Sequence, residues 1–263
     1  MGKQYLGIAF CDQCGEEIER VDLWDIHGTH LGYPQDWWPE DVCGSEECQA
    51  VIEAEREAEA NRVKVMTAEA AKQLLSNEEE LVIWGGLSDE DYTHIDLDAA
   101  EMLIRHKELN VENRAIRLKG LKEISPEVAT LFREYKGKRL GFGKNFVPSV
   151  EVAKLLSKCE CELWFSWEYI PGSDEGDGDP IAEALSHHKG GLGISVDWME
   201  DISCEWLSNY EGKWLGIGDC GEQVYLSNTS AEFLAKCKYL ILDLSTVDKE
   251  AREILKDTPG CYY

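Results

Sequence analysis

A repeated pattern runs through this chain from Thr67 to its end. Each unit begins with a residue suited to cap a helix, continues with a short apolar helix and a few polar residues, and ends in a short strand. Such capping side chains accept hydrogen bonds from the free N–H groups of a first helical turn. The assigned caps, spaced 20 to 30 residues apart, are Thr67, Asp96, Ser125, Ser149, Asp179, Asp201, Asn228 and Asp248. The pattern predicts a short helix after each.

The predicted strands follow the helices in step. They are residues 81–84, 116–118, 140–142, 163–165, 192–194, 215–217 and 240–242. One short helix with one short strand cannot bury its apolar face alone, whereas stacked units share a continuous core. We therefore predict the α/β class, as a solenoid of short strands and short helices, over residues 63–263.

The strand cores read Leu-x-Leu or close to it, as in 215–217 and 240–242. With its helical return segments, this region resembles the leucine-rich-repeat proteins. It departs from that family in lacking the asparagine at the matching positions and in a repeat length that drifts. An open α/β sheet is the alternative, because alternating helices and strands also describe βαβ units. That fold would need longer helices, longer strands and a glycine-rich switch loop, which the sequence lacks.

Residues 1–62 carry two cysteine pairs with the spacing of a zinc site. Cys11 and Cys14 form a C-x2-C pair, and Cys43 and Cys48 a C-x4-C pair. The second pair opens a helix-forming run, and a helix N-terminus favours thiolates. Two such pairs supply a closed tetrahedral zinc site, and the module resembles a treble-clef or zinc-ribbon finger. The expected zinc is structural, since four thiolates leave no open coordination position.

Two other uses of these cysteines stay open. Disulfides would need an oxidising compartment. The polar start of the chain predicts no signal peptide, so we expect a cytoplasmic protein with reduced thiols. His27 or His30, which lie between the two pairs, could instead serve as zinc ligands.

The charge of the chain limits its partners. The 263 residues include 52 acidic and 26 basic side chains, a formal net charge of −26. Proteins that bind nucleic acid by neutralising phosphates need clustered Lys and Arg, so we expect no such partner and favour a basic protein. A nucleic-acid-associated regulator that uses the finger is the alternative function. No apolar run is long enough for a membrane-spanning helix, so no membrane partner is expected.

The outward positions of the predicted strands form the candidate partner surface. The third, fifth and sixth strands carry only glycine or serine there, and glycine inside a strand often marks the close approach of another backbone or a ligand. The partner-binding candidates are Trp84, Arg117, Trp164, Ser166, Ser195 and Asp243. Alternatively, the small residues relieve crowding on a curved face, or the finger folds over it.

The sequence predicts a non-catalytic interaction protein. Ser-His-Asp, G-x-x-x-x-G-K and H-E-x-x-H arrangements are missing, and the acidic loop 171–180 does not match the calcium-binding loop pattern. His187 and His188 are expected at the surface of a turn. A hydrolase or transferase with a site in 171–191 is the enzymatic alternative.

Overall fold

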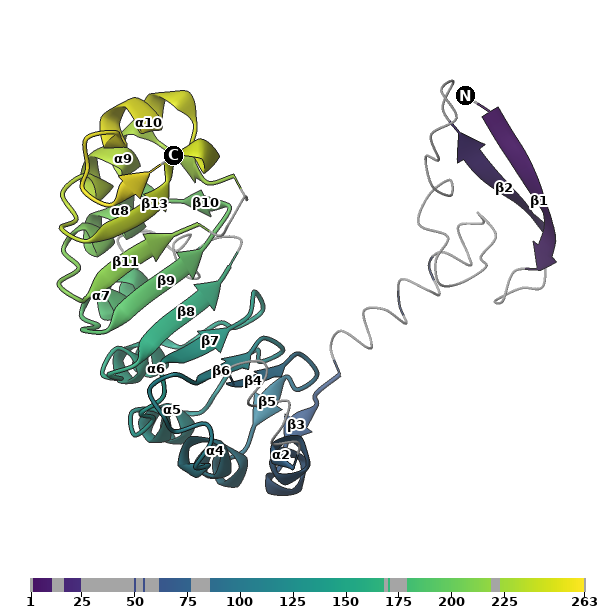
Figure 1. The fold of residues 1–263 in the computed structure, drawn as a ribbon, viewed down its shortest axis with the longest axis horizontal. Coiled ribbons are helices and arrows are strands. Elements are labelled where there is room, and N and C mark those ends of the chain that lie inside the picture. The colour runs from purple at the N-terminus through teal and green to yellow at the C-terminus, as the bar shows by residue number, and fades with distance from the viewer. Residues whose placement is uncertain are drawn as a thin grey trace. The chain divides into compact units, whose positions relative to one another are not determined.

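The computed structural model of the chain describes residues 2–10, 17–24, 50, 54, 62–76, 86–167, 170, 179–218 and 223–262, with 2–10 and 17–24 described by their backbone only. The chain divides into two compact units, Met1–Arg62 and Val63–Tyr263 (Figure 1). None of the described helices is long and apolar enough to cross a lipid bilayer.

In the first unit, β1 (Gly2–Phe10) and β2 (Glu17–Trp24) form an antiparallel pair. Phe10 lies opposite Glu17, so the connection between the two strands is residues 11–16. The predicted zinc ligands Cys11, Cys14, Cys43 and Cys48 lie outside the described residues, as do His27 and His30.

The second unit is a mixed α/β structure with an eight-stranded parallel sheet. The strands lie side by side in the order of the chain: β4 (Gly86–Asp89), β6 (Ala115–Leu118), β7 (Arg139–Phe142), β8 (Glu162–Ser166), β9 (Gly191–Ser195), β11 (Trp214–Ile217), β13 (Leu240–Asp243) and β14 (Cys261–Tyr262). The predicted strands from 116–118 to 240–242 are confirmed, while 81–84 lies outside the described residues. The first strand of the described sheet is β4.

Helices precede or connect these strands and line one side of the sheet in Figure 1. They are α2 (Ala68–Leu75), α4 (Leu97–Arg105), α5 (Pro126–Phe132), α6 (Val150–Leu156), α7 (Pro180–Ser186), α8 (Asp201–Ser208), α9 (Asn228–Leu234) and α10 (Lys249–Leu255). Each helix from α4 onward packs against its neighbours in the chain. The short strands β3 (Val65–Met66) and β5 (His94–Ile95) pair in parallel, as do β10 (Trp198–Met199) and β12 (Tyr225–Leu226), and η2 (Leu244–Thr246) follows β13.

Most of the predicted helix caps are confirmed. The side chains of Thr67, Asp96, Ser125, Ser149, Asp179 and Asp248 accept hydrogen bonds from first-turn N–H groups. The other two assignments are wrong by one residue, because α8 and α9 begin at Asp201 and Asn228 themselves. The Asp201 carboxylate instead accepts hydrogen bonds from the hydroxyl groups of Ser227 and Ser230 at the start of α9. These bonds link the successive helices α8 and α9.

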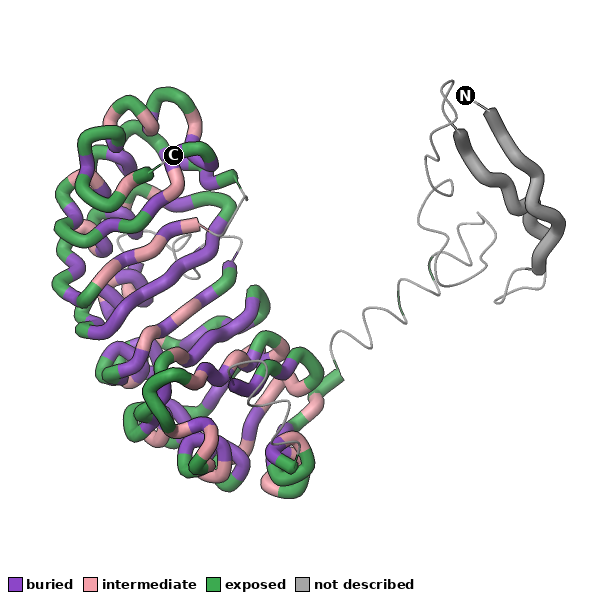
Figure 2. Tube along the Cα trace, in the orientation of Figure 1, coloured by how far each residue is buried: buried purple, intermediate pink, exposed green. Residues whose placement is uncertain are grey.

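The core consists of two rows of apolar side chains across the inner face of the sheet. Strand register places members of each row directly opposite one another, and all are at least 95% buried. One row is Ile116, Leu140, Leu163, Leu192, Leu215 and Leu240, and the other is Leu118, Phe142, Phe165, Ile194, Ile217 and Leu242. Figure 2 shows these strands as a mostly buried layer. Because neighbouring strands bury matched side chains against one another, the strands share one continuous core.

Buried tyrosine and histidine side chains connect successive helix–strand segments at the turn before a strand. The Tyr135 hydroxyl donates to the Arg114 carbonyl at 3.0 Å, and the Tyr210 hydroxyl to the Gly190 carbonyl at 2.7 Å. His188 occupies the same place in its unit, where its Nδ1 lies 3.1 Å from the Ser157 carbonyl. The expectation that His188 lies at the surface is wrong: it is fully buried, and this burial lowers its pKa.

Candidate functional site

The outer face of the sheet carries a row of unlike side chains across six strands. Register aligns Arg117, Gly141, Trp164, Gly193, Gly216 and Ile241, from β6 to β13. A second row lies two residues earlier on the strands, with Arg139 opposite Glu162 and Gly191 opposite Trp214. Large side chains on this face therefore lie beside positions that have none.

The glycines of β9 make room for the protein's own tryptophans. A Cβ atom on Gly193 would lie 2.5 Å from Cδ2 of Trp164, and a Cβ on Gly191 would lie 2.2 Å from Cε2 of Trp214. Both distances are far below van der Waals contact, so each indole lies directly on a glycine of the neighbouring strand. The glycines of β9 are thus covered from within the chain, which favours the crowding interpretation there over a groove for a partner backbone.

The two indoles are held in place by their neighbours. The guanidinium carbon of Arg139 lies 4.3 Å from the Trp164 ring centroid, and Arg139 also pairs with Glu162, Nη2 to Oε2, at 2.9 Å. The ring centroids of Trp164 and Trp214 are 5.7 Å apart, with the planes inclined by 60°. This geometry suits an edge-to-face aromatic pair. The wall that these rings form is therefore present before any partner arrives.

Next to this wall the sheet is hollowed into a pocket of about 240 Å³, which we call the strand-face pocket. Its lining comes from β8, β11, β13, η2 and β14 and comprises Trp164, Trp214, Gly216, Ile217, Gly218, Ile241, Asp243, Thr246 and Tyr262. Ile241 and Tyr262 are 42% and 52% exposed. Exposed aromatic and aliphatic side chains around a preformed hollow are typical of a binding site.

Asp243 is the charged group of this pocket. Its Oδ1 accepts a hydrogen bond from the Ser245 N–H at 2.8 Å. Hydrogen bonds from Ser245 lower the pKa of Asp243, so the carboxylate is ionised at neutral pH. Within the part of the chain that the structure describes, Asp243 forms no ion pair.

The predicted partner-binding residues are distributed unevenly over this face. Trp164 and Asp243 line the same pocket, whereas half-buried Arg117 lies against Gly141, on the other side of Trp164. Ser166 and Ser195 are directly opposite in register, with Ser166 exposed and Ser195 buried. Trp84 lies outside the described residues.

Sequence analysis missed Trp214 and Tyr262 as members of the site. The strand at 215–217 was predicted one residue too short, and extending the alternation of facing by one residue places Trp214 on the outer face. The last strand, β14, has only two residues and leaves no periodic pattern to detect.

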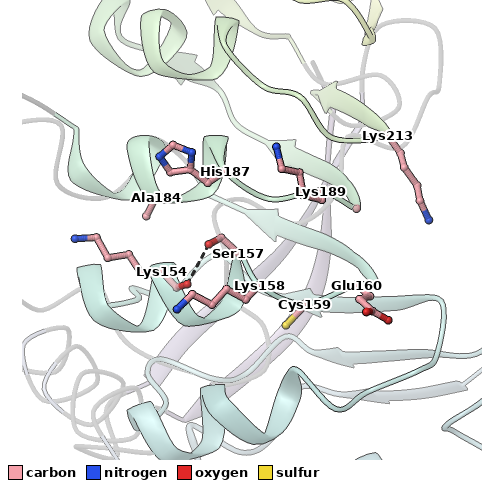
Figure 3. A pocket seen from close by; sticks show the side chains of 10 residues that line it. Lys154, Ser157, Lys158, Cys159, Glu160, Ala184, His187, Lys189 and Lys213 are labelled. Carbon is pink, nitrogen blue, oxygen red and sulfur yellow. Dashed lines mark hydrogen bonds between the residues drawn. The ribbon is translucent and has the colours of Figure 1, made fainter.

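A second, larger hollow of about 830 Å³ lies where helices end and strands begin. Figure 3 shows Lys154, Lys158, Lys189 and Lys213 around it, with His187 nearby. Cations are favoured near helix C-termini because of the helix dipole, and Lys189 pairs with Glu211 at 2.9 Å. Lys154 and Lys158 lie at the C-terminal end of α6 and Lys189 follows the end of α7, so the helix dipole accounts for these three lysines.

Nucleophilic chemistry has little support in this hollow. The Cys159 thiol lines it, but a hydrogen bond with Cys161 and burial raise its pKa well above the ordinary range. A thiol rather than a thiolate is a poor nucleophile. Among the residues that the structure describes, no three His, Cys, Asp or Glu side chains gather as metal ligands.

The buried pair Asp179 and Ser203 has a structural role. Asp179 is fully buried, and its Oδ1 accepts from the N–H groups of Ile181 and Ala182 at the start of α7. Its Oδ2 accepts from the Ser203 hydroxyl on α8. This pair caps one helix and ties it to the next.

Comparison of the sequence with protein-family models gives no match, and comparison with curated proteins gives none either.

Proposed function

We propose that the protein is a non-catalytic interaction module. In this proposal residues 63–263 form a leucine-rich-repeat-like solenoid that binds a protein partner on its strand face, and residues 1–62 form a structural zinc finger. The single observation that carries the binding role is the strand-face pocket, with its fixed indole wall and exposed rim.

The strand order supports the solenoid over an open doubly wound sheet. A doubly wound sheet reverses its strand order at a switch point, where ligands bind. The described sheet runs from β4 to β14 without a reversal, and its apolar rows are in register from unit to unit. Stacked repeats, in which each unit contacts mainly its neighbours, have this organisation.

The zinc finger is supported by where the first cysteine pair falls. Cys11 and Cys14 lie in the connection between β1 and β2, whose ends are opposite one another at Phe10 and Glu17. A C-x2-C pair between antiparallel strands can direct two thiolates to one ion, and Cys43 and Cys48 would complete the tetrahedron. The zinc would stabilise a unit too small for a large core.

The partner is expected to be a protein with a basic surface in the cytoplasm. A net charge of −26 favours association with positive surfaces and disfavours nucleic acids. Hydrophobic and aromatic anchors with a polar rim are the usual composition of a protein interface.

The experiment is affinity capture from the native source with the full chain, followed by binding measurements with the purified, identified partner. Trp164→Ala removes part of the indole wall, and we expect it to weaken binding at least tenfold, as for a typical anchor residue. Trp198→Ala is the matched control, because Trp198 is 50% exposed on β10 and does not line the pocket.

Circular dichroism and urea unfolding establish that both variants are folded. A partner that binds both variants equally well contradicts the proposed surface. A partner lost only when Lys158 and Lys213 are changed to alanine would place the interface at the lysine-lined hollow instead.

A further inference from the structure

The lining of the strand-face pocket combines aromatic rings with the carboxylate of Asp243, for which the described residues provide no ion-pair partner. Trp164 on β8 and Tyr262 on β14 come from the two outermost strands of the lining, with Trp214 between them. The face of an aromatic ring carries partial negative charge and attracts cations, most strongly when the ring is an indole. A carboxylate in the same pocket adds a full negative charge, so the site suits a positively charged group.

The protein already contains one arrangement of this kind. The Arg139 guanidinium lies over the Trp164 ring and pairs at the same time with the Glu162 carboxylate. A planar guanidinium can stack on an aromatic face while its edge donates to a carboxylate, which a compact ammonium group does less well. Trp214, Tyr262 and Asp243 provide the same combination of ring and carboxylate without a cation from the described residues.

Asp243 has capacity for such a partner. It accepts hydrogen bonds from Ser245, of which the bond from the N–H to Oδ1 is 2.8 Å long. The two oxygens of a carboxylate offer about four acceptor positions, so room is left for a further donor. Charge-assisted hydrogen bonds from a guanidinium to a carboxylate are roughly twice as strong as neutral ones.

The size of the pocket fits one side chain. Its volume of about 240 Å³ is below the ~300–1,000 Å³ of sites for drug-sized molecules. The space exists because Gly216 and Gly218 carry no side chains and Gly218 has a φ of 82°, which disfavours any other residue.

We propose that the strand-face pocket binds the side chain of an arginine in a basic segment of the protein partner, stacked on the aromatic lining and paired with Asp243. This inference rests on the proposed function, since it names the chemistry of the partner at that same surface.

The test uses the full chain and three capped glycine–serine peptides, measured by isothermal titration calorimetry at low salt. One peptide carries two arginines, the second two lysines, and the third two citrullines, which keep the shape of arginine without its charge. We expect the arginine peptide to bind more tightly than the lysine peptide and the citrulline peptide to bind least. Repeating the titrations at higher salt measures how much of the binding comes from nonspecific attraction of a cationic peptide to an acidic protein.

Two variants locate the binding. Asp243→Asn should weaken the arginine peptide about tenfold or more, as expected for a charge-assisted hydrogen bond. Tyr262→Ala should weaken it about two- to fivefold, as for one exposed cation–π contact. Asp257→Asn is the matched control: Asp257 is exposed and does not line the pocket. It removes the same charge, so its effect should stay below about twofold.

Equal effects of Asp243→Asn and Asp257→Asn would overturn the proposal, because binding would then reflect overall charge. Equal binding of the arginine and lysine peptides, or of the arginine and citrulline peptides, would overturn the choice of arginine. If these effects are missing while the purified partner still requires Trp164, the interaction role stands and only the arginine assignment fails. If the partner ignores Trp164 while the peptide effects are present, the reverse holds.

Discussion

Gly193 offers a direct test of why glycine lies on the strand face. If glycine is there because an indole covers it, a single added methyl group should be costly. A Cβ on Gly193 would lie 2.5 Å from Cδ2, 2.6 Å from Cε2 and 2.7 Å from Cε3 of Trp164. Carbon atoms normally approach to about 3.5–4.0 Å, so in Gly193→Ala the ring must move by about 1 Å. That shift disturbs its contacts with Arg139 and Trp214.

The magnitude follows from two opposing effects. Overpacking of this kind costs about 1–3 kcal/mol, whereas replacing glycine by alanine stabilises by about 0.4–1 kcal/mol through the unfolded chain. We expect Gly193→Ala to lower the free energy of unfolding by about 1–2 kcal/mol, or the melting temperature by roughly 2–8 °C for a unit of this size.

Two other glycines of the same row provide a graded control. The nearest atom to a Cβ on Gly216 is Cζ3 of Trp214 at 3.2 Å, and on Gly141 it is Cγ of Arg117 at 3.5 Å. Gly216→Ala should therefore be close to neutral, and Gly141→Ala neutral or stabilising. Urea unfolding followed by circular dichroism and tryptophan fluorescence ranks the three. Equal stability of the Gly193 and Gly141 variants would refute the reasoning.

Three further predictions concern other parts of the chain. Burial raises the pKa of Asp179 above its ordinary value, so the contribution of this carboxyl group to the free energy of unfolding is greatest below about pH 4 and is lost as the pH rises through the raised pKa. Asp179→Asn keeps a capping oxygen but does not titrate, so its free energy of unfolding in urea should not show that decline. A variant with the same pH profile as the wild type would contradict this prediction. Burial raises the pKa of Cys204 to about 12 and that of half-exposed Cys261 to about 11. Iodoacetamide should therefore label Cys261 of the native chain before Cys204. Faster labelling of Cys204, measured by peptide mass spectrometry, would contradict this prediction. Elemental analysis of the full chain should find about one zinc per chain, lost in Cys43→Ser, and a metal-free wild-type chain would reject the finger.

The repeated helices and strands could be predicted because their signals are local. A capping side chain acts within three residues of itself, and the inward apolar positions alternate within one strand. The predicted caps are confirmed for α4 to α7 and for α10, and the predicted alternation is confirmed from β6 to β13. Two caps were assigned one residue too late. At the start of α9 both Ser227 and Asn228 are good capping residues, so the local signal does not separate them. At the start of α8 the preceding residue is Glu200, whose side chain makes no capping hydrogen bond.

The links between units could not be predicted, because they depend on residues 20 or more positions apart. Tyr135 and Tyr210 each reach a carbonyl of the preceding unit, and His188 does so from the same place. A weak signal exists in the sequence: each of these rings is followed two residues later by glycine. A Cβ on Gly137 would lie 2.0 Å from the Tyr135 hydroxyl oxygen, so a ring-x-Gly pattern marks the places where a buried ring needs space.

The candidate site was likewise predicted where the signal is local and missed where it depends on neighbouring strands. Trp164 and Asp243 were predicted from outward facing alone, and they line one pocket. The indole that completes the wall, Trp214, needed the strand to be extended by one residue. Indoles cover the glycines of β9 because of the direction in which the tryptophan side chains extend across neighbouring strands. Sequence periodicity does not specify that direction.

The direction of the parallel strands also explains how an acidic chain distributes its charge around the pocket. Each helix from α4 to α10 begins after a strand ends, so capping acids such as Asp96, Asp179 and Asp248 gather at the carboxyl edge of the described sheet. Lysines such as Lys189 and Lys213 follow helix C-termini and lie at the opposite edge. Both placements are favoured by the helix dipole. Asp243 ends β13 and therefore lies at the acidic edge of the sheet, so we expect the same residues that cap the helices to steer a basic segment toward the strand-face pocket.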